Sequence, residues 1–165
     1  DGIIIGEPTG GTSPRVAGLA QALVAAGFDA RVSERIQQDI WYKLWGNMTM
    51  NPISAFTGAT TDQMLDDELV SGYCLAVMEE AAAIGARIGC PIAQSGADRM
   101  AVTRKLGAFK TSMLQDAEAS RPLEIDALLT VVREIASRVD VRTPHLDGLL
   151  GLTRLFARTK GLYPA

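Results

Sequence analysis

Residues 41–57, with the sequence WYKLWGNMTMNPISAFT, decide how the rest of the chain is interpreted. Within this stretch Lys43, Asn47 and Asn51 recur every four residues. Each step of four along an α-helix advances about 40° beyond a full turn, so the three side chains share one stripe. Carboxamides on a Trp- and Met-rich helix need hydrogen-bonding partners, which predicts a polar binding site. In the alternative interpretation, Lys43 extends to solvent and the asparagines tie neighbouring helices together.

Composition sets limits on the function. The 165 residues suggest one domain, or one domain and a fragment, and a start at Asp1 suggests a fragment or a processed chain. A net charge of −3 argues against a nucleic-acid partner. No signal peptide and no segment able to span a membrane are expected. Cys74 and Cys90 are too isolated for a disulfide framework or a metal site; as buried small hydrophobes they favour a cytoplasmic location.

The first 33 residues predict a β–α–β unit. Residues 2–5 form a β-branched apolar run typical of a buried strand, and residues 30–32 indicate a second strand. Between them, Ser13 followed by Pro14 predicts the start of a helix that stops at Gly27. The loop at residues 6–11 is glycine-rich, but it lacks the G-x-G-x-x-G spacing and is interpreted as a plain turn.

The remainder of the chain, residues 34–165, predicts a mainly helical domain. Glu79 and Glu80 are expected on a solvated helix face, and His145 is expected to be exposed. Ser112 and Gln115 match a capping box, with Ser112 as N-cap. After the central stretch, helices are expected at residues 62–89, 95–106, 111–119, 120–139 and 146–156.

Four patches of the chain resemble the ketopantoate reductase family. The most specific is the central pattern W-x-K-x-x-x-N-x-x-x-N-P beginning at Trp41. The others are Gly6-Glu7 with Gly10 and Ser13, the run TSMLQD at residues 111–116, and LEID at residues 123–126 followed by Thr143-Pro144. The chain departs from some members at Thr60-Thr61, where they offer an asparagine to the substrate.

The resemblance implies a fold and a reaction. The fold would be a helical C-terminal domain like that of 6-phosphogluconate dehydrogenase, over residues 34–165. It would follow the last β–α–β piece of a Rossmann domain, residues 1–33. The reaction would be the NADPH-dependent reduction of 2-dehydropantoate to pantoate. No metal is expected. Independently of the resemblance, the unpaired strand edges at residues 2–5 and 30–32 favour a homodimer formed by strand addition. The main NADP-binding half would be absent from this chain, leaving an isolated fragment inactive.

The resemblance also implies a role for each site residue. Lys43 would be the general acid, and Lys43, Asn47, Asn51 and Ser112 would bind the substrate. Glu124 would contact the cofactor ribose. Two alternatives remain open at this point, a reductase of another 2-oxo acid and a non-catalytic helical oligomerisation domain.

Overall fold

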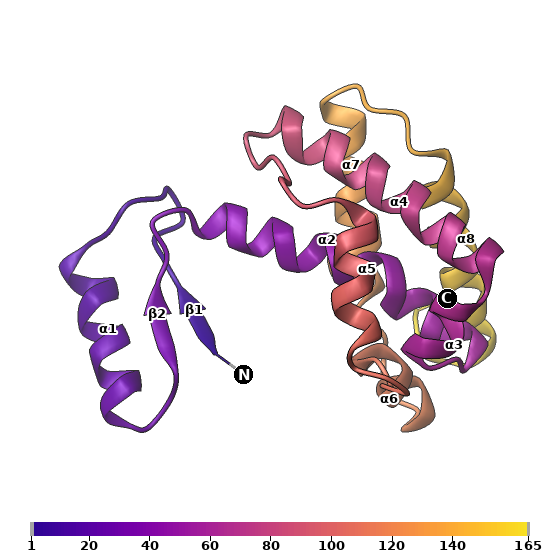
Figure 1. Ribbon diagram of the computed structural model, residues 1–165, viewed down its shortest axis with the longest axis horizontal. Helices are drawn as coiled ribbons and strands as arrows, with labels where there is room; N and C mark the ends of the chain where they lie inside the picture. Colours follow the sequence, from indigo (N-terminus) through magenta and orange to yellow (C-terminus); the bar gives the residue numbers. More distant parts are fainter. Residues whose placement is uncertain (1, 165) are drawn as a thin grey trace. The chain divides into compact units, whose positions relative to one another are not determined.

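The computed structural model describes residues 2–164, which form two compact units (Figure 1). The first unit ends at Lys43 and the second begins at Leu44. Each unit contains part of one long helix, α2 (Ile36–Thr57). This helix continues through Pro52. The domain boundary suggested by the sequence, between residues 33 and 34, precedes this helix, whereas the two compact units meet within it.

The first unit is the β–α–β unit that the sequence predicts. Strands β1 (Ile3–Ile5) and β2 (Ala30–Val32) pair in parallel, and α1 (Pro14–Ala25) connects them. The Ser13 hydroxyl accepts a hydrogen bond from the Val16 N–H at 3.2 Å, which confirms it as the N-cap. Strand side chains alternate between two faces, and Ile4 is 40% exposed. The prediction of a fully buried first strand is therefore wrong.

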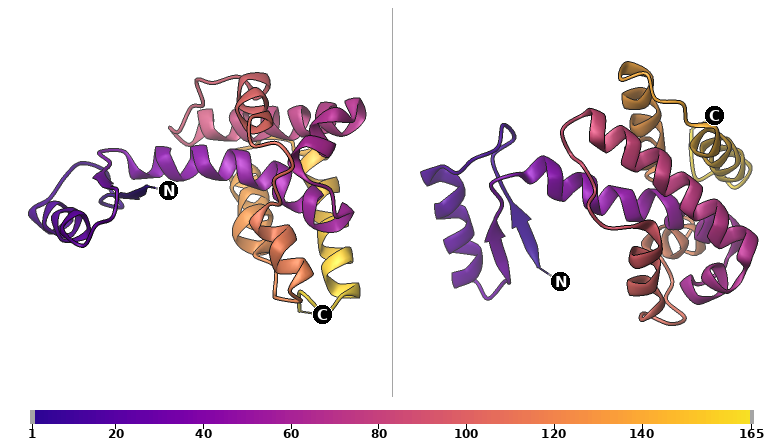
Figure 2. Two further views of the ribbon diagram at one scale, coloured as in Figure 1. Left: turned by 60° about the horizontal axis from the view of Figure 1, so that its bottom comes forward. Right: turned by 45° about the horizontal axis from the view of Figure 1, so that its top comes forward.

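The second unit is a helical domain built around α4 (Glu68–Arg87) (Figure 2). Besides α2, helix α4 contacts α3 (Thr61–Asp66), α5 (Gly96–Arg104), α7 (Val131–Arg138) and α8 (Pro144–Thr159). A short helix, α6 (Ser112–Glu118), and a π-helical turn, η1 (Asp126–Thr130), lie between α5 and α7. Side chains with at most 1% exposure mark the core, among them Trp45, Met48, Val77, Ile84, Ile125, Leu129, Leu146 and Leu149. The mainly helical fold class is confirmed.

Two predicted helices differ from the observed ones because local capping interrupts them. The helix expected at residues 62–89 is divided at Asp67, whose backbone is extended. The Asp67 carboxylate accepts hydrogen bonds from the Leu69 and Val70 N–H groups, both at 3.0 Å, and so begins α4. The helix expected at residues 120–139 begins only at η1, since Ser120 adopts a left-handed conformation with φ of 53°.

Helix α4 is also long and apolar enough to cross a membrane by length and composition, with a mean hydropathy of 1.3 over its best window. The expectation that no segment reaches this threshold is wrong. The reason lies in its central position: a helix that contacts α3, α5, α7 and α8 must be apolar on several faces. Core helices of water-soluble proteins pass the same test, so the finding is weak support for a membrane span.

Both cysteines are buried and free, as predicted. Cys74 is 0% and Cys90 6% exposed. Burial raises the pKa of the Cys74 thiol to about 12, because the interior disfavours the thiolate. Cys74 is therefore a packing residue of α4.

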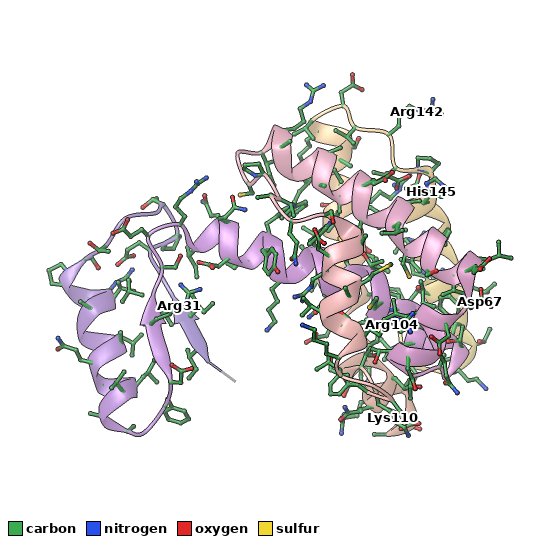
Figure 3. The ribbon with its side chains drawn as sticks, in the orientation of Figure 1. Arg31, Asp67, Arg104, Lys110, Arg142 and His145 are labelled. Carbon is green, nitrogen blue, oxygen red and sulfur yellow. The ribbon has the colours of Figure 1, made fainter. Side chains whose placement is uncertain are left out.

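Glu80 caps the start of α8 from the facing helix α4. Its carboxylate accepts hydrogen bonds from the backbone N–H groups of His145 and Leu146, both at 2.9 Å, and lies 2.7 Å from His145 Nδ1. Figure 3 shows His145 at this junction. The Glu80 side chain is only 11% exposed, so its predicted place on a solvated face is wrong, whereas His145 is exposed as predicted. The sequence pattern of α4 does not reveal this cap, because the N–H groups that donate to Glu80 come from a segment far along the chain.

We expect Glu80→Ala to lower the free energy of unfolding by about 1–3 kcal/mol, because two N–H groups at the start of α8 lose their acceptor. Urea denaturation measures this change. The control is Glu79→Ala, since Glu79 is the exposed neighbour with the same charge, and it should change stability by less than about 0.5 kcal/mol. Equal effects of the two substitutions would show that Glu80 does not cap α8.

Candidate active site

Helix α2 is fixed against α4 by a buried tryptophan. The Trp45 indole N–H donates a 2.9 Å hydrogen bond to the Met78 carbonyl oxygen, and Trp45 is 1% exposed. Met48, one turn later on α2, is fully buried. These contacts fix the rotation of this part of α2, and so they determine which of its residues face the core and which face the space beside it.

That space is a cavity of about 110 Å³ within the second unit. Four consecutive elements, α2 to α5, contribute to its wall, and the connection from α5 to α6 completes it. The lining residues are Gly46, Asn47, Met50, Asn51, Thr61, Met78, Arg99, Thr103, Leu106, Phe109 and Thr111. Leu106 and Phe109 are 59% and 46% exposed, so the side formed by this connection is open to solvent.

The wall opposite α2 is held in place by hydrogen bonds between α3 and the segment after α5. Thr61 donates from its backbone N–H to the Phe109 carbonyl at 3.0 Å and from its hydroxyl to the Gly107 carbonyl at 2.8 Å. Arg104, labelled in Figure 3, donates to the Leu65 carbonyl and the Asp66 carboxylate on α3. The connection that forms this side of the cavity is therefore fixed by α3.

The structure brings Asn47 and Asn51 together at this cavity. Both line it from consecutive turns of α2, and Asn51 is only 8% exposed. Within residues 2–164, neither carboxamide side chain forms a hydrogen bond to the protein. Their donors and acceptors are thus available to a ligand in the cavity.

The other predicted site residues lie outside the cavity lining. Lys43 is exposed, one helical turn before Asn47 on α2, and ends the first unit. Ser112 is exposed at the first position of α6. Its predicted role as N-cap is wrong: the Thr111 hydroxyl accepts from the Leu114 N–H, and Thr111 is the residue that lines the cavity.

Glu124 is exposed and precedes an unusual backbone element. The π-helical turn η1 begins two residues later, and such turns are frequent at functional sites. Asp126 at its start accepts hydrogen bonds from Tyr163 and Thr130, and these hydrogen bonds lower the pKa of the Asp126 carboxyl. The segment that carries Glu124 is thereby tied to the end of the chain.

Sequence reasoning missed Arg99 as a lining residue. It comes from α5, far from the central stretch, so no spacing in the sequence connects it with Asn47. Thr61, at the start of α3, also lines the cavity. Within residues 2–164, no three His, Cys, Asp or Glu side chains are grouped as a metal site would require.

Comparisons with known proteins agree with this architecture. Residues 35–157 match the family described as ketopantoate reductase PanE/ApbA, C terminal. A 2-dehydropantoate 2-reductase of Mesorhizobium japonicum is 43% identical over 159 residues, which are 96% of this chain and 49% of that protein. The chain spans about half the length of the curated relatives it matches.

Solved structures match across both units. A crystal structure of a Ralstonia solanacearum MolK2 protein superposes with a TM-score of 0.94 at 64% identity, covering 99% of this chain and 50% of that chain. The 2-dehydropantoate 2-reductase of Methylococcus capsulatus gives a TM-score of 0.88 at 33% identity, covering 95% and 51%. The chain therefore belongs to the ketopantoate reductase family and corresponds to its C-terminal part.

Proposed function

We propose that this chain is the substrate-binding part of an NADPH-dependent ketopantoate reductase, which converts 2-dehydropantoate to pantoate for pantothenate and coenzyme A synthesis. One observation carries the proposal: two carboxamides open into a small cavity from the same helix that bears Lys43, in a member of this family. The two buried thiols fit a reducing compartment such as the cytoplasm.

The cavity suits a small branched 2-oxo acid with a hydroxyl group. Asn47, Asn51 and the threonines Thr61 and Thr103 offer hydrogen-bond donors and acceptors in its lining. Met50, Met78, Leu106 and Phe109 add apolar groups to the same lining. A substrate that carries both oxygen atoms and a dimethyl-substituted carbon matches this mixed lining.

In this proposal Lys43 is the proton donor. Reduction of the ketone adds a hydride to carbon and builds negative charge on the carbonyl oxygen; NADPH supplies that hydride when bound. The Lys43 ammonium group gives a proton to the oxygen, which becomes the hydroxyl of the product, and the exposed amine regains a proton from water. Asn47 and Asn51 hold the substrate oxygens, and Ser112 adds a further contact.

In this proposal the described residues of the chain bind only part of the nucleotide. The sheet of the described residues has two strands, and the loop after β1 reads GEPTGGTSP, without the glycine spacing that receives a pyrophosphate. Glu124 is the cofactor contact that we propose here, with its exposed carboxylate accepting a ribose hydroxyl. The nucleotide is otherwise bound by the part of the enzyme that precedes this chain in its relatives.

We expect Lys43→Ala in the complete protein to lower turnover of 2-dehydropantoate by about 10²- to 10⁴-fold, because the reaction loses its general acid. Lys43→Arg retains the charge but hardly releases a proton, so its turnover should fall as well. Steady-state kinetics with NADPH measures both. Lys160→Ala removes another exposed lysine, on the segment after α8, and is the control.

Asn51→Ala should differ from Lys43→Ala. It removes a substrate contact and should therefore mainly raise KM. Near-normal turnover of the Lys43→Ala protein would remove Lys43 from the mechanism. Full activity of Lys43→Arg, with an inactive alanine variant, would reduce its role to electrostatic stabilisation.

The main alternative is a reductase of the same fold that acts on another 2-oxo acid, and Thr61 on the cavity wall is the observation that favours it. We expect a panel of 2-oxo acids, assayed with the complete protein, to give the highest kcat/KM for 2-dehydropantoate. A larger value for a different acid would reassign the substrate. A lack of activity on every acid would favour a non-catalytic oligomerisation domain.

The isolated 165-residue chain should neither bind NADP tightly nor catalyse reduction. Its first unit contains a two-stranded sheet and leaves Ile4, Leu19, Val24 and Phe28 between 40% and 55% exposed. Unpaired strand edges recruit other strands, so we expect a dimer formed by strand pairing or a disordered first unit. Light scattering and NADP titration test this. A monomer with high NADP affinity would contradict it.

A further inference from the structure

An edge of the Arg99 guanidinium group is directed at the backbone of α2 at Gly46. A Cβ atom placed on Gly46 would lie 3.1 Å from both Nε and Nη2 of Arg99 and 3.5 Å from its Cζ. Because the two nitrogens are nearer than the carbon that joins them, the Nε–Nη2 edge of the group faces the glycine. The Arg99 Nε is buried, and the side chain lines the cavity together with Asn47 and Thr103.

Without this contact, glycine would be an unfavourable residue at position 46. It lies in the middle of α2, between Trp45 and Asn47, where glycine destabilises a helix relative to alanine. Its backbone does not need positive φ, since Gly46 is absent from the positive-φ residues of the described chain. The close approach of Arg99 supplies the physical reason for a glycine here.

Arg99 gives the cavity its charge. Of the described residues that line the cavity, Arg99 is the one with a charged side chain, and the others are amide, hydroxyl or apolar groups. A guanidinium that lines a cavity together with two carboxamides suits an anion as the ligand. The planar shape of the group favours an anion with two parallel oxygens, which is a carboxylate.

We propose that Arg99, seated on Gly46, binds the carboxylate of the substrate and makes the site specific for acids over neutral ketones. This inference rests on the proposed function and adds a residue to it. The carboxylate of a 2-oxo acid is attached to the carbonyl carbon, so holding one group also positions the other for reduction. Arg99 acts by binding, and the proton still comes from Lys43.

The test compares an acid with its neutral ester in the complete protein. Arg99→Gln should raise KM for 2-dehydropantoate by about 10- to 100-fold, the effect of losing a charge-assisted hydrogen bond pair. KM for the methyl ester of the same compound should change less than about threefold, so the preference for the acid is largely lost. Arg99→Lys should restore part of it, and KM for NADPH should remain unchanged.

Two controls separate binding from structural effects. Lys105→Gln removes a positive charge from the exposed end of the same helix and should leave the acid preference intact. Gly46→Ala adds the Cβ atom that Arg99 must avoid, so KM for the acid should rise several-fold although alanine favours the helix. Gly72→Ala on α4 has open space around the new atom and should stabilise without altering KM.

The outcomes distinguish this inference from the proposed function. Reduction of 2-oxo acids with an unchanged acid preference in Arg99→Gln would overturn the inference and leave the function standing. An equal loss for acid and ester would also overturn it, because the role of Arg99 would then be structural. If no 2-oxo acid is reduced, calorimetric titration with pantoate decides: binding lost in Arg99→Gln supports the inference, and any other result overturns it.

Discussion

The hydrogen bond from the Trp45 indole to the Met78 carbonyl is the interaction on which the site depends. It joins α2 to the central helix α4 in an environment where an unpaired indole N–H would cost about 1–3 kcal/mol. A tryptophan at this depth cannot rotate, and neither can the helix that carries it. Asn47 and Asn51 therefore face the cavity because Trp45 faces the core.

The second constraint is that polar groups must be held in an otherwise apolar domain. Asn51 is 8% exposed and has no hydrogen bond from its side chain to the protein within residues 2–164, so its carboxamide can bind a ligand in the cavity. Gly46 makes α2 less stable than an alanine would, but it leaves room for the Arg99 guanidinium. Both features suit the substrate that we propose, an anion with several oxygen atoms.

The sequence predicts most of the elements because their signals are local. The β–α–β unit follows from an apolar run, the Ser13-Pro14 start and Gly27, and the Lys43–Asn47–Asn51 spacing is visible without coordinates. The sequence does not show interactions between segments that lie far apart along the chain. Glu80 caps α8 across 65 residues, and Arg99 reaches α2 from another helix. Thr111 rather than Ser112 caps α6, a choice between adjacent hydroxyls that depends on backbone conformation.

A crystal structure of the complete protein with NADP⁺ and a 2-hydroxy acid product tests the central claim most directly. The account predicts that the acid occupies the cavity of Asn47 and Asn51, with its hydroxyl oxygen about 3 Å from Lys43 Nζ and its carboxylate against Arg99. An acid bound outside this cavity, or a Lys43 side chain directed away from the hydroxyl, would contradict it.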